Sequence, residues 1–330
     1  MTRHIAQKIA TAFVTIYVII TISFFLVHIM PGDPVIHLVG QEEYYYLLDN
    51  DPETLNKLIA RYGLDDSLPV QYGKYLKNIV TLDFGPSYTN QKPVVSNVLR
   101  ASKWTLLLSI PTWIIGGLLG ALLGVIAGWK PGKLFDKIMT PILLVVNTIP
   151  SNCLCLILLI FFAYRMKLFP INGMVSPGVE GMARVQSILQ HMFLPLIIMI
   201  LYRTSGDFML MKSAVSQVRS EEYIMTAESK GLPSKRVLFR HVMKNAMVPY
   251  ATSFCMQFGG ILSGSMIIEV VFGWKGMGTI LYNAVSNRDF PTAQFCFLLS
   301  AVLVVFSNLI SDIINAAIDP RIREEGVQDA

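Results

Sequence analysis

One stretch decides how this chain is organised: residues 219–249, RSEEYIMTAESKGLPSKRVLFRHVMKNAMVP. It is the longest polar interruption in an otherwise apolar C-terminal half. Apolar runs long enough to cross a bilayer lie on both sides of it. The stretch is therefore predicted to be a loop at a membrane surface that carries its own secondary structure. We interpret it as the working contact of a membrane protein.

Two helices are predicted inside this loop. No helix breaker interrupts residues 221–230, and the following Gly231-Leu232-Pro233 is typical of a glycine cap and a stop. Pro233 suits the first turn of a second helix that is expected to run to about Ala246. One face of that helix is expected to carry Val237, Leu238, His241, Val242 and Asn245. A short rigid helix at the membrane surface can seat in a groove of a soluble partner and pass motion to the flanking spans.

The composition indicates an integral membrane protein. Hydrophobic residues make up 53% of the chain, charged residues 15%, and the mean hydropathy is +0.52, whereas roughly a quarter of a soluble domain is charged. The four cysteines, Cys153, Cys155, Cys255 and Cys296, lie in apolar runs, which favours packing over disulfides or a zinc site. The formal charge of +5 does not point to nucleic acid, because in a membrane protein its location matters more than its sum.

Six apolar runs can cross a hydrocarbon core of about 30 Å. They are residues 9–30, 104–129, 137–164, 188–211, 247–271 and 292–318. This predicts an all-α integral membrane protein with six transmembrane helices. Its expected parts are an N-terminus and first span at 1–30, an extramembrane region at 31–103, a transmembrane core at 104–318 with a loop at 212–246, and a tail at 319–330.

The first apolar run is expected to be retained, because it is too long for a signal peptide and Pro31-Gly32-Asp33-Pro34 follows without a cleavage site. In the extramembrane region, residues 52–62 have the spacing of an amphipathic helix that Gly63 ends. A second short helix is predicted at residues 70–80.

Small and charged residues within the spans indicate helix packing. Glycines recur every four residues on one face of the second span, at Gly116, Gly120, Gly124 and Gly128, so two backbones can approach closely there. Arg203 and Asp207 are i, i+4 neighbours that can pair, and snorkelling toward the inner surface is the structural interpretation favoured for both. A proton relay would need more such groups at mid-membrane.

Charge counting predicts that both termini are cytoplasmic. Totals of Lys and Arg on the two sides are nearly balanced, but long loops carry less weight in this rule. Among the short connections, the bias comes from Arg3 and Lys8 at the start and from Lys130, Lys133 and Lys137 after the second span. The loop at 212–246 is then cytoplasmic as well.

No catalytic, cofactor-binding or metal site is predicted. The five histidines show no zinc spacing. The nearest approach to a phosphate-binding loop, residues 128–134, has its first glycine one position too close and Leu134 in place of the Ser or Thr that would hold magnesium. The chain is not expected to hydrolyse ATP, so energy must come from another chain.

The loop resembles the coupling loop of permease subunits of bacterial ABC importers, in the version of the oligopeptide, dipeptide and nickel systems. The resemblance is carried by Glu222-Tyr223-x-x-Thr226-Ala227-x-x-Lys230-Gly231-Leu232, Arg240-His241 and Asn245-Ala246-x-x-Pro249. Outside the loop it extends, in order, to the B-type permease of that family through Pro31-Gly32-Asp33-Pro34, Asp83-Phe84-Gly85-x-Ser87, Glu269-x-x-Phe272-x-Trp274-x-Gly276-x-Gly278, Asp289-x-Pro291 and Asp319-Pro320-Arg321.

The resemblance implies the type I importer permease fold in a bacterial inner membrane. It also implies a heterodimer with a C-type permease, two cytoplasmic ABC ATPases that bind ATP and Mg, and an extracytoplasmic solute-binding protein. The residues implied in ATPase coupling are Glu222, Tyr223, Thr226, Ala227, Glu228, Lys230, Gly231 and Leu232. Those implied in an outer gate or in docking of the binding protein are Asp83, Phe84, Glu269, Phe272, Trp274, Gly276, Gly278 and Asp289.

The expected cargo is peptide, and nickel or another small solute is the alternative within the same family. Outside it, an ion-coupled secondary transporter would need inverted repeats and acidic sites at mid-membrane, and neither is evident in the sequence. A structural subunit of another membrane complex is the third possibility. Residues 31–103 together with 272–291 are expected to form the outer docking surface and gate, and their tyrosine and tryptophan residues are equally well explained as interfacial anchors beside lipid.

Overall fold

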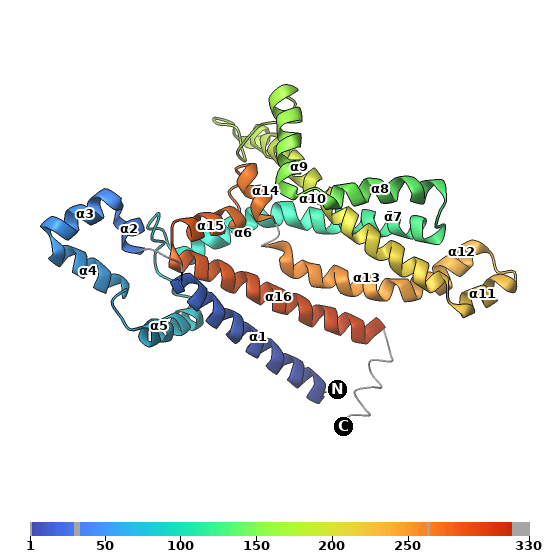
Figure 1. Ribbon diagram of the computed structural model, residues 1–330, viewed down its shortest axis with the longest axis horizontal. Coiled ribbons are helices and arrows are strands. Elements are labelled where there is room, and N and C mark those ends of the chain that lie inside the picture. The colour runs from blue at the N-terminus through green and yellow to red at the C-terminus, as the bar shows by residue number, and fades with distance from the viewer. Residues whose placement is uncertain (1, 30–33, 263–264, 319–330) are drawn as a thin grey trace.

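The computed structural model describes residues 2–29, 34–262 and 265–318. Within these ranges the regular structure is helical, joined by turns and loops, with one isolated antiparallel bridge between Pro86 and Pro93. Figure 1 shows an elongated bundle with short helices at both ends. At one end lie α2 (Pro34–Val39), α3 (Gln41–Asn50) and α4 (Pro52–Tyr62), and at the other α11 (Glu222–Ser229) and α12 (Ser234–Val237). Pro31-Gly32-Asp33 and the predicted tail at 319–330 lie outside the described residues.

Three described helices are long and apolar enough to cross a membrane. The first, Val94–Trp129, joins α6 (Val94–Pro111) to α7 (Gly117–Trp129) through a π-helical turn at Thr112–Gly116. The second is α10 (Gly181–Arg219), and the third is the Phe290–Ile314 part of α16 (Phe290–Ile318). A shorter apolar stretch, Ala10–Leu26, lies in α1 (Thr2–Ile29), which runs beside α16 (Figure 1). Both α6 and α10 extend well beyond their predicted spans.

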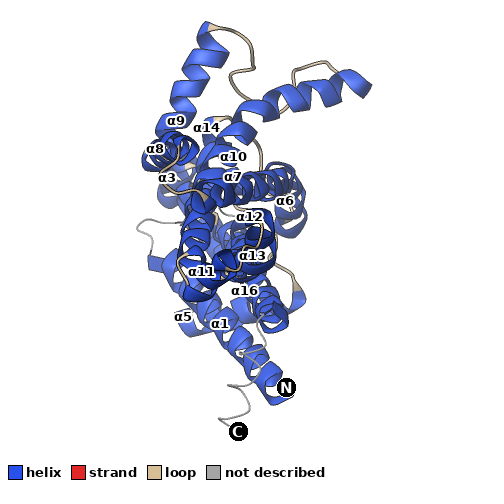
Figure 2. Ribbon diagram, turned by 90° about the vertical axis from the view of Figure 1, so that its right-hand side faces the viewer, coloured by secondary structure: helices blue, strands red, loops and turns tan. Residues whose placement is uncertain are grey.

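The prediction of a continuous third span at residues 137–164 is wrong. The structure has α8 (Leu134–Thr148) and α9 (Ser151–Leu158), the latter continued by a π-helical stretch Leu159–Arg165, and the two halves are bent by 100°. The bend lies at Pro150, which lacks a backbone N–H and forces the residue before it out of the helical region. Ile149 accordingly has ψ 128°. Figure 2 shows the helical character of these segments from a second side.

The fifth predicted span, residues 247–271, is also interrupted. Helix α13 (Met243–Phe258) ends in a 3₁₀ turn at Gly259–Ile261, and α14 (Met266–Val271) follows as a separate helix. Two consecutive glycines, Gly259 and Gly260, have low helix propensity and mark this break. At the other end, α12 continues through a π-helical turn, Leu238–Val242, into α13, so the second loop helix does not stop near Ala246. The count of six crossings stays a prediction.

The extramembrane helices are confirmed by their caps. Helix α4 begins after Asp51, whose side chain accepts a hydrogen bond from the Thr54 N–H over 3.1 Å, and ends at Gly63 with φ 65°. The Thr54 hydroxyl and N–H hold the pKa of Asp51 below its ordinary value. The second predicted helix is α5 (Leu68–Thr81). Val35, Leu47 and Leu55 form a small core shared with the unpredicted α2 and α3.

Four glycines bring α7 and the turn before it against α10. A Cβ would lie 2.7 Å from the Arg203 Cβ at Gly116, 2.6 Å from that of Asp207 at Gly120, 2.8 Å from that of Met211 at Gly124 and 2.9 Å from that of Val215 at Gly128. No such approach is possible with a larger residue at the present spacing. Because the facing positions rise together along both helices, α7 and α10 run parallel.

Candidate functional site

Helix α11 presents one face to the bundle and the other to its surroundings. Ile224 and Ala227 are buried against α10 and α13 in a cluster that includes Val215 and Val242. The remaining predicted coupling residues are exposed, except for the half-buried Leu232. They are Glu222, Tyr223, Thr226, Glu228, Lys230 and Gly231. Ala227 therefore allows close packing within its own chain. Its role in ATPase coupling stays a prediction.

The end of α11 is defined by Gly231. Its φ is 73°, its N–H donates to the Glu228 carbonyl over 2.9 Å, and the Leu232 N–H donates to the Ala227 carbonyl over 3.4 Å. These are the two bonds of a glycine-capped helix end. The predicted stop at Gly231-Leu232-Pro233 is confirmed, with α11 itself ending at Ser229.

Side chains tie α11 to the long helices. Asn245 of α13 donates a hydrogen bond to the Tyr223 hydroxyl over 2.6 Å. On α10, the guanidinium of Arg219 lies 5.3 Å from the ring centroid of Trp129, at the end of α7. One side-chain hydrogen bond thus joins α11 to α13, and the end of α10 that precedes α11 packs on the end of α7.

At the other end, Glu269 is the centre of a buried polar cluster. It lies in α14 with no exposed surface, and its Oε1 accepts hydrogen bonds from the hydroxyls of Thr105 and Ser265, each over 2.7 Å. Its Oε2 accepts from the Thr279 N–H, in α15 (Met277–Ser286), over 3.1 Å. The carboxyl group thus joins α6, α14 and α15.

The other residues of the motif that begins at Glu269 pack around this cluster. A Cβ at Gly276 would lie 2.5 Å from the Glu269 Oε2, and one at Gly278 2.9 Å from it, so glycine is required at both positions. The indole N–H of Trp274 donates to the Trp104 carbonyl over 3.0 Å, and Phe272 is buried nearby.

Asp289 holds a second buried cluster. Its Oδ2 accepts from the hydroxyls of Ser87 and Thr292, and its Oδ1 accepts from the Tyr88 N–H over 3.1 Å. The contact with Thr292 caps α16, and the contacts with Ser87 and Tyr88 anchor the loop before α6. Phe84 of the same loop packs on Phe295, with ring centroids 5.0 Å apart.

Most residues of the predicted gate or docking set are buried, and their role stays a prediction. Asp83 is exposed, but the other seven, Phe84, Glu269, Phe272, Trp274, Gly276, Gly278 and Asp289, are buried within the chain. They hold together the end at which a gate is predicted. The partners Thr105 and Ser87 were not predicted, because nothing in the local sequence signals a contact between positions so far apart.

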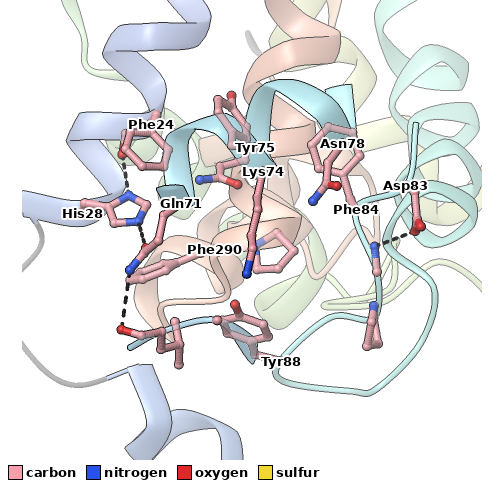
Figure 3. A pocket seen from close by; sticks show the side chains of 16 residues that line it. Phe24, His28, Gln71, Lys74, Tyr75, Asn78, Asp83, Phe84, Tyr88 and Phe290 are labelled. Atoms are coloured by element: carbon pink, nitrogen blue, oxygen red, sulfur yellow. Dashed lines mark hydrogen bonds between the residues drawn. The ribbon is translucent and has the colours of Figure 1, made fainter. Parts of the chain in front are cut away.

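A polar pocket of about 310 Å³ lies at the same end, between α1, α5 and the start of α16 (Figure 3). His28 connects its walls: its Nδ1 lies 2.8 Å from the Phe24 carbonyl oxygen and its Nε2 2.9 Å from the Gln71 Oε1. The Gln71 amide donates in turn to the Asp66 carbonyl over 2.8 Å. Burial raises the pKa of Tyr75, which also lines the pocket, to about 12.

Arg203 and Asp207 form a buried pair, not a snorkelling one. The Arg203 Nε lies 2.7 Å from the Asp207 Oδ2, and the side chains are 10% and 2% exposed. The Asp207 Oδ1 also accepts from the Gln257 amide of α13 over 3.3 Å. The pair therefore sits inside the contact between α7, α10 and α13.

Long apolar helices and a capped polar helix held against one end of them define a multi-pass integral membrane protein. Residues 120–324 match the family described as binding-protein-dependent transport system inner membrane component. Residues 1–109 match the N-terminal part described for membrane components of the same systems. The chain belongs to this family of inner-membrane transport components.

Similarity to individual relatives covers nearly the whole chain. It is 31% identical to the di/tripeptide transport system permease protein DppB of Pseudomonas aeruginosa, over 98% of this chain and 100% of the relative. It is 30% identical to the oligopeptide transport system permease protein OppB of Salmonella typhimurium, with the same two coverages. The glutathione transport system permease protein GsiC of Salmonella paratyphi A is 28% identical, over 98% of this chain and 99% of the relative.

Proposed function

We propose that this chain is a permease subunit of an ATP-driven importer and forms part of the pathway for peptides. The observation that carries the proposal is similarity along almost the whole chain to permeases whose names specify di- and tripeptides, oligopeptides and glutathione. All three cargo classes share peptide bonds and a free carboxylate. The chain is proposed to carry no cofactor, and ATP and Mg are bound by partner ATPases.

The exposed face of α11 is proposed as the contact with one of two cytoplasmic ABC ATPases. Tyr223 and Met225 are 44% and 54% exposed there and offer apolar contact area to a partner. Glu228 and Lys230, which follow them in the chain, are exposed and add one negative and one positive charge. The start of α1 and the end of α16 point to the same end of the bundle as α11 (Figure 1), so both termini are proposed to be cytoplasmic.

The opposite end is proposed to receive a solute-binding protein, and a second, C-type permease is proposed to complete the pathway. On α3, Tyr45 and Tyr46 are 50% and 61% exposed. Replacing both by Ser tests docking against lipid anchoring. Loss of binding-protein-stimulated ATPase activity in vesicles, with insertion unchanged, supports docking; an unchanged response excludes it at these residues.

Co-purification and uptake test the function as a whole. A tagged chain is expected to bring down a second permease and two ATPases, and the reconstituted complex with its binding protein is expected to accumulate a labelled dipeptide in an ATP-dependent way. Accumulation of nickel or of a sugar without competition by peptide would establish the alternative cargo. Transport by the isolated chain, driven by an ion gradient, would establish a secondary transporter instead.

A further inference from the structure

A cavity of about 610 Å³ lies where α6, α9, α10, α13 and α14 meet. Helices α9, α10 and α14 lie close together in both views (Figure 1 and Figure 2). Both helix breaks open onto it: Ser151 lines it directly after the bend at Pro150, and Gly260 lines it from the 3₁₀ turn after α13. Ligand sites in transport proteins form at discontinuous helices of this kind. The volume is in the usual range for small-molecule sites, roughly 300–1,000 Å³.

Two side chains in its wall, Arg203 and Ser109, carry buried polar atoms with no hydrogen-bond partner among the described residues. The Arg203 Nη2 is one such atom, on a side chain that is 10% exposed. The Ser109 Oγ is another, on a residue that is 4% exposed. Buried polar groups are nearly always paired, so an unpaired donor in a cavity wall indicates an absent acceptor. A guanidinium N–H and a hydroxyl can both donate, which fits an oxygen ligand.

The rest of the Arg203 side chain is fixed in place. Its Nε is held by Asp207, whose other oxygen is held by Gln257, and its guanidinium lies 5.5 Å from the ring centroid of Phe254. Gly116 leaves room for the Arg203 Cβ and Cγ against α6 and α7. The Nη2 group is therefore preorganised, and its orientation does not depend on a ligand.

Charge and shape limit the class of ligand. Arg203 is the sole charged residue among the described residues that line the cavity. The remaining wall is largely apolar and includes Trp113, Met199, Met256 and Ile268. Methionine and aromatic walls adapt to different side chains, and a guanidinium recognises a carboxylate specifically. Peptides vary in their side chains and share one C-terminal carboxylate. The adaptable apolar wall suits the varying side chains, and the guanidinium suits the shared carboxylate.

We propose that Arg203 and Ser109 bind the C-terminal carboxylate of a peptide in transit through this cavity. The inference rests on peptide being the cargo, as proposed above. The guanidinium Nη2 and the Ser109 hydroxyl donate to the carboxylate oxygens, while Asp207 acts as a positioning residue for Arg203. Side chains of the peptide occupy the apolar part of the cavity without being selected strongly.

A two-by-two comparison separates this site from the binding protein. Uptake of a labelled dipeptide and of its C-terminal amide is measured in vesicles that contain the assembled importer, with either wild-type chain or Arg203→Gln and with the same binding protein. Any preference of the binding protein cancels in the ratio of ratios. The acid-to-amide preference is expected to fall about tenfold or more in Arg203→Gln, as for loss of a charge-assisted hydrogen bond.

Control variants distinguish recognition from folding. Arg203→Lys keeps the charge and is expected to retain part of the acid preference, and Ser109→Ala is expected to lower it by about threefold, as for a neutral hydrogen bond. Asp207→Asn weakens the pair that positions Arg203 but leaves the guanidinium in the wall, so it is expected to lower the preference by less than Arg203→Gln does. A preference that Asp207→Asn and Arg203→Gln lower equally would assign Arg203 a structural role only and overturn the proposal.

The remaining outcomes are also decisive. If wild-type importer transports both peptides and Arg203→Gln leaves the ratio unchanged, this inference is overturned while the proposed function stands. If the wild-type complex transports neither peptide, the proposed function fails first, and this inference falls with it. If the ratio is unchanged but ATPase activity without peptide depends on anionic lipid through Arg203, the site binds a lipid phosphate and the peptide assignment is overturned.

Discussion

Asn245 and Tyr223 join α11 directly to α13, through a hydrogen bond of 2.6 Å from the Asn245 amide to the Tyr223 hydroxyl. Both side chains are exposed, so the bond contributes little to folding, about 1 kcal/mol or less. Its position gives it a different significance, because α12 and α13 form one helical path into the bundle. If α11 contacts an ATPase as proposed, this bond is the direct side-chain route from α11 to α13.

Tyr223→Phe tests that path. We expect the melting temperature of the complex to change little and the number of peptides moved per ATP hydrolysed to fall, since the aromatic ring stays and the link to Asn245 is lost. Tyr282→Phe, at an exposed tyrosine of α15, is the matched control. An unchanged transport-to-hydrolysis ratio in Tyr223→Phe would show that the bond carries no motion.

Gly231→Arg is expected to abolish uptake and leave membrane insertion intact. A Cβ at this position would meet nothing within 4 Å, so the cost is in the backbone, where φ is 73°, and amounts to about 1–2 kcal/mol for most residues. Gly231→Asn, which tolerates this conformation better, is expected to retain most of the uptake. Normal peptide-stimulated ATPase activity in Gly231→Arg would argue against the coupling role.

Gly120→Ala is expected to destabilise the bundle by about 1–3 kcal/mol through overpacking. The new Cβ would lie 2.6 Å from the Asp207 Cβ and 2.8 Å from the Thr204 carbonyl oxygen, and backbone cannot give way easily. Gly206→Ala on α10 is the control, because a Cβ there meets nothing within 4 Å. Thermal unfolding in detergent measures both. Equal melting temperatures for the two variants would contradict the close packing of α7 on α10.

Glu269→Ala is expected to cost about 3–5 kcal/mol, since it leaves a cavity and the donors of Thr105, Ser265 and Thr279 without their acceptor. Glu269→Gln keeps the volume and one acceptor oxygen, so its loss is expected to be smaller. Glu53→Ala, at an exposed ion pair with Lys57, is expected to change stability by less than about 1 kcal/mol. The same detergent unfolding assay ranks the three variants. A Glu269→Ala protein as stable as Glu53→Ala would exclude a structural role for this carboxyl group.

Features with local chemistry were predictable from the sequence. The capped helix α4 and the stop after α11 follow from residues within one turn of Gly63 and Gly231, whose backbone conformation few other residues adopt. Continuous spans were less predictable. Pro195 lies inside an unbroken α10, whereas Pro150 separates α8 from α9, and the difference depends on neighbouring helices that one sequence does not specify.

In the candidate sites, too, local features were predictable from the sequence and long-range contacts were not. Exposure of most of α11 follows from its polar face, and the sequence identified its residues. The burial of Glu269 and Asp289 could not be predicted, because each also requires a hydroxyl group more than one hundred positions away in the chain, that of Thr105 and that of Ser87 respectively. The cavity at Arg203 is lined at two helix breaks, and the prediction of unbroken spans did not include these breaks.

The parallel course of α7 and α10 settles how the chain travels between them. Because position rises in the same direction on both helices, the chain leaves α7 at one end of the bundle and must start α10 at the other. The bent pair α8 and α9, with the loop that follows, therefore carries the chain back from the end of α7 toward the start of α10, which favours a broken span over a re-entrant hairpin. The kink at Pro150 changes the direction of this crossing without cancelling it.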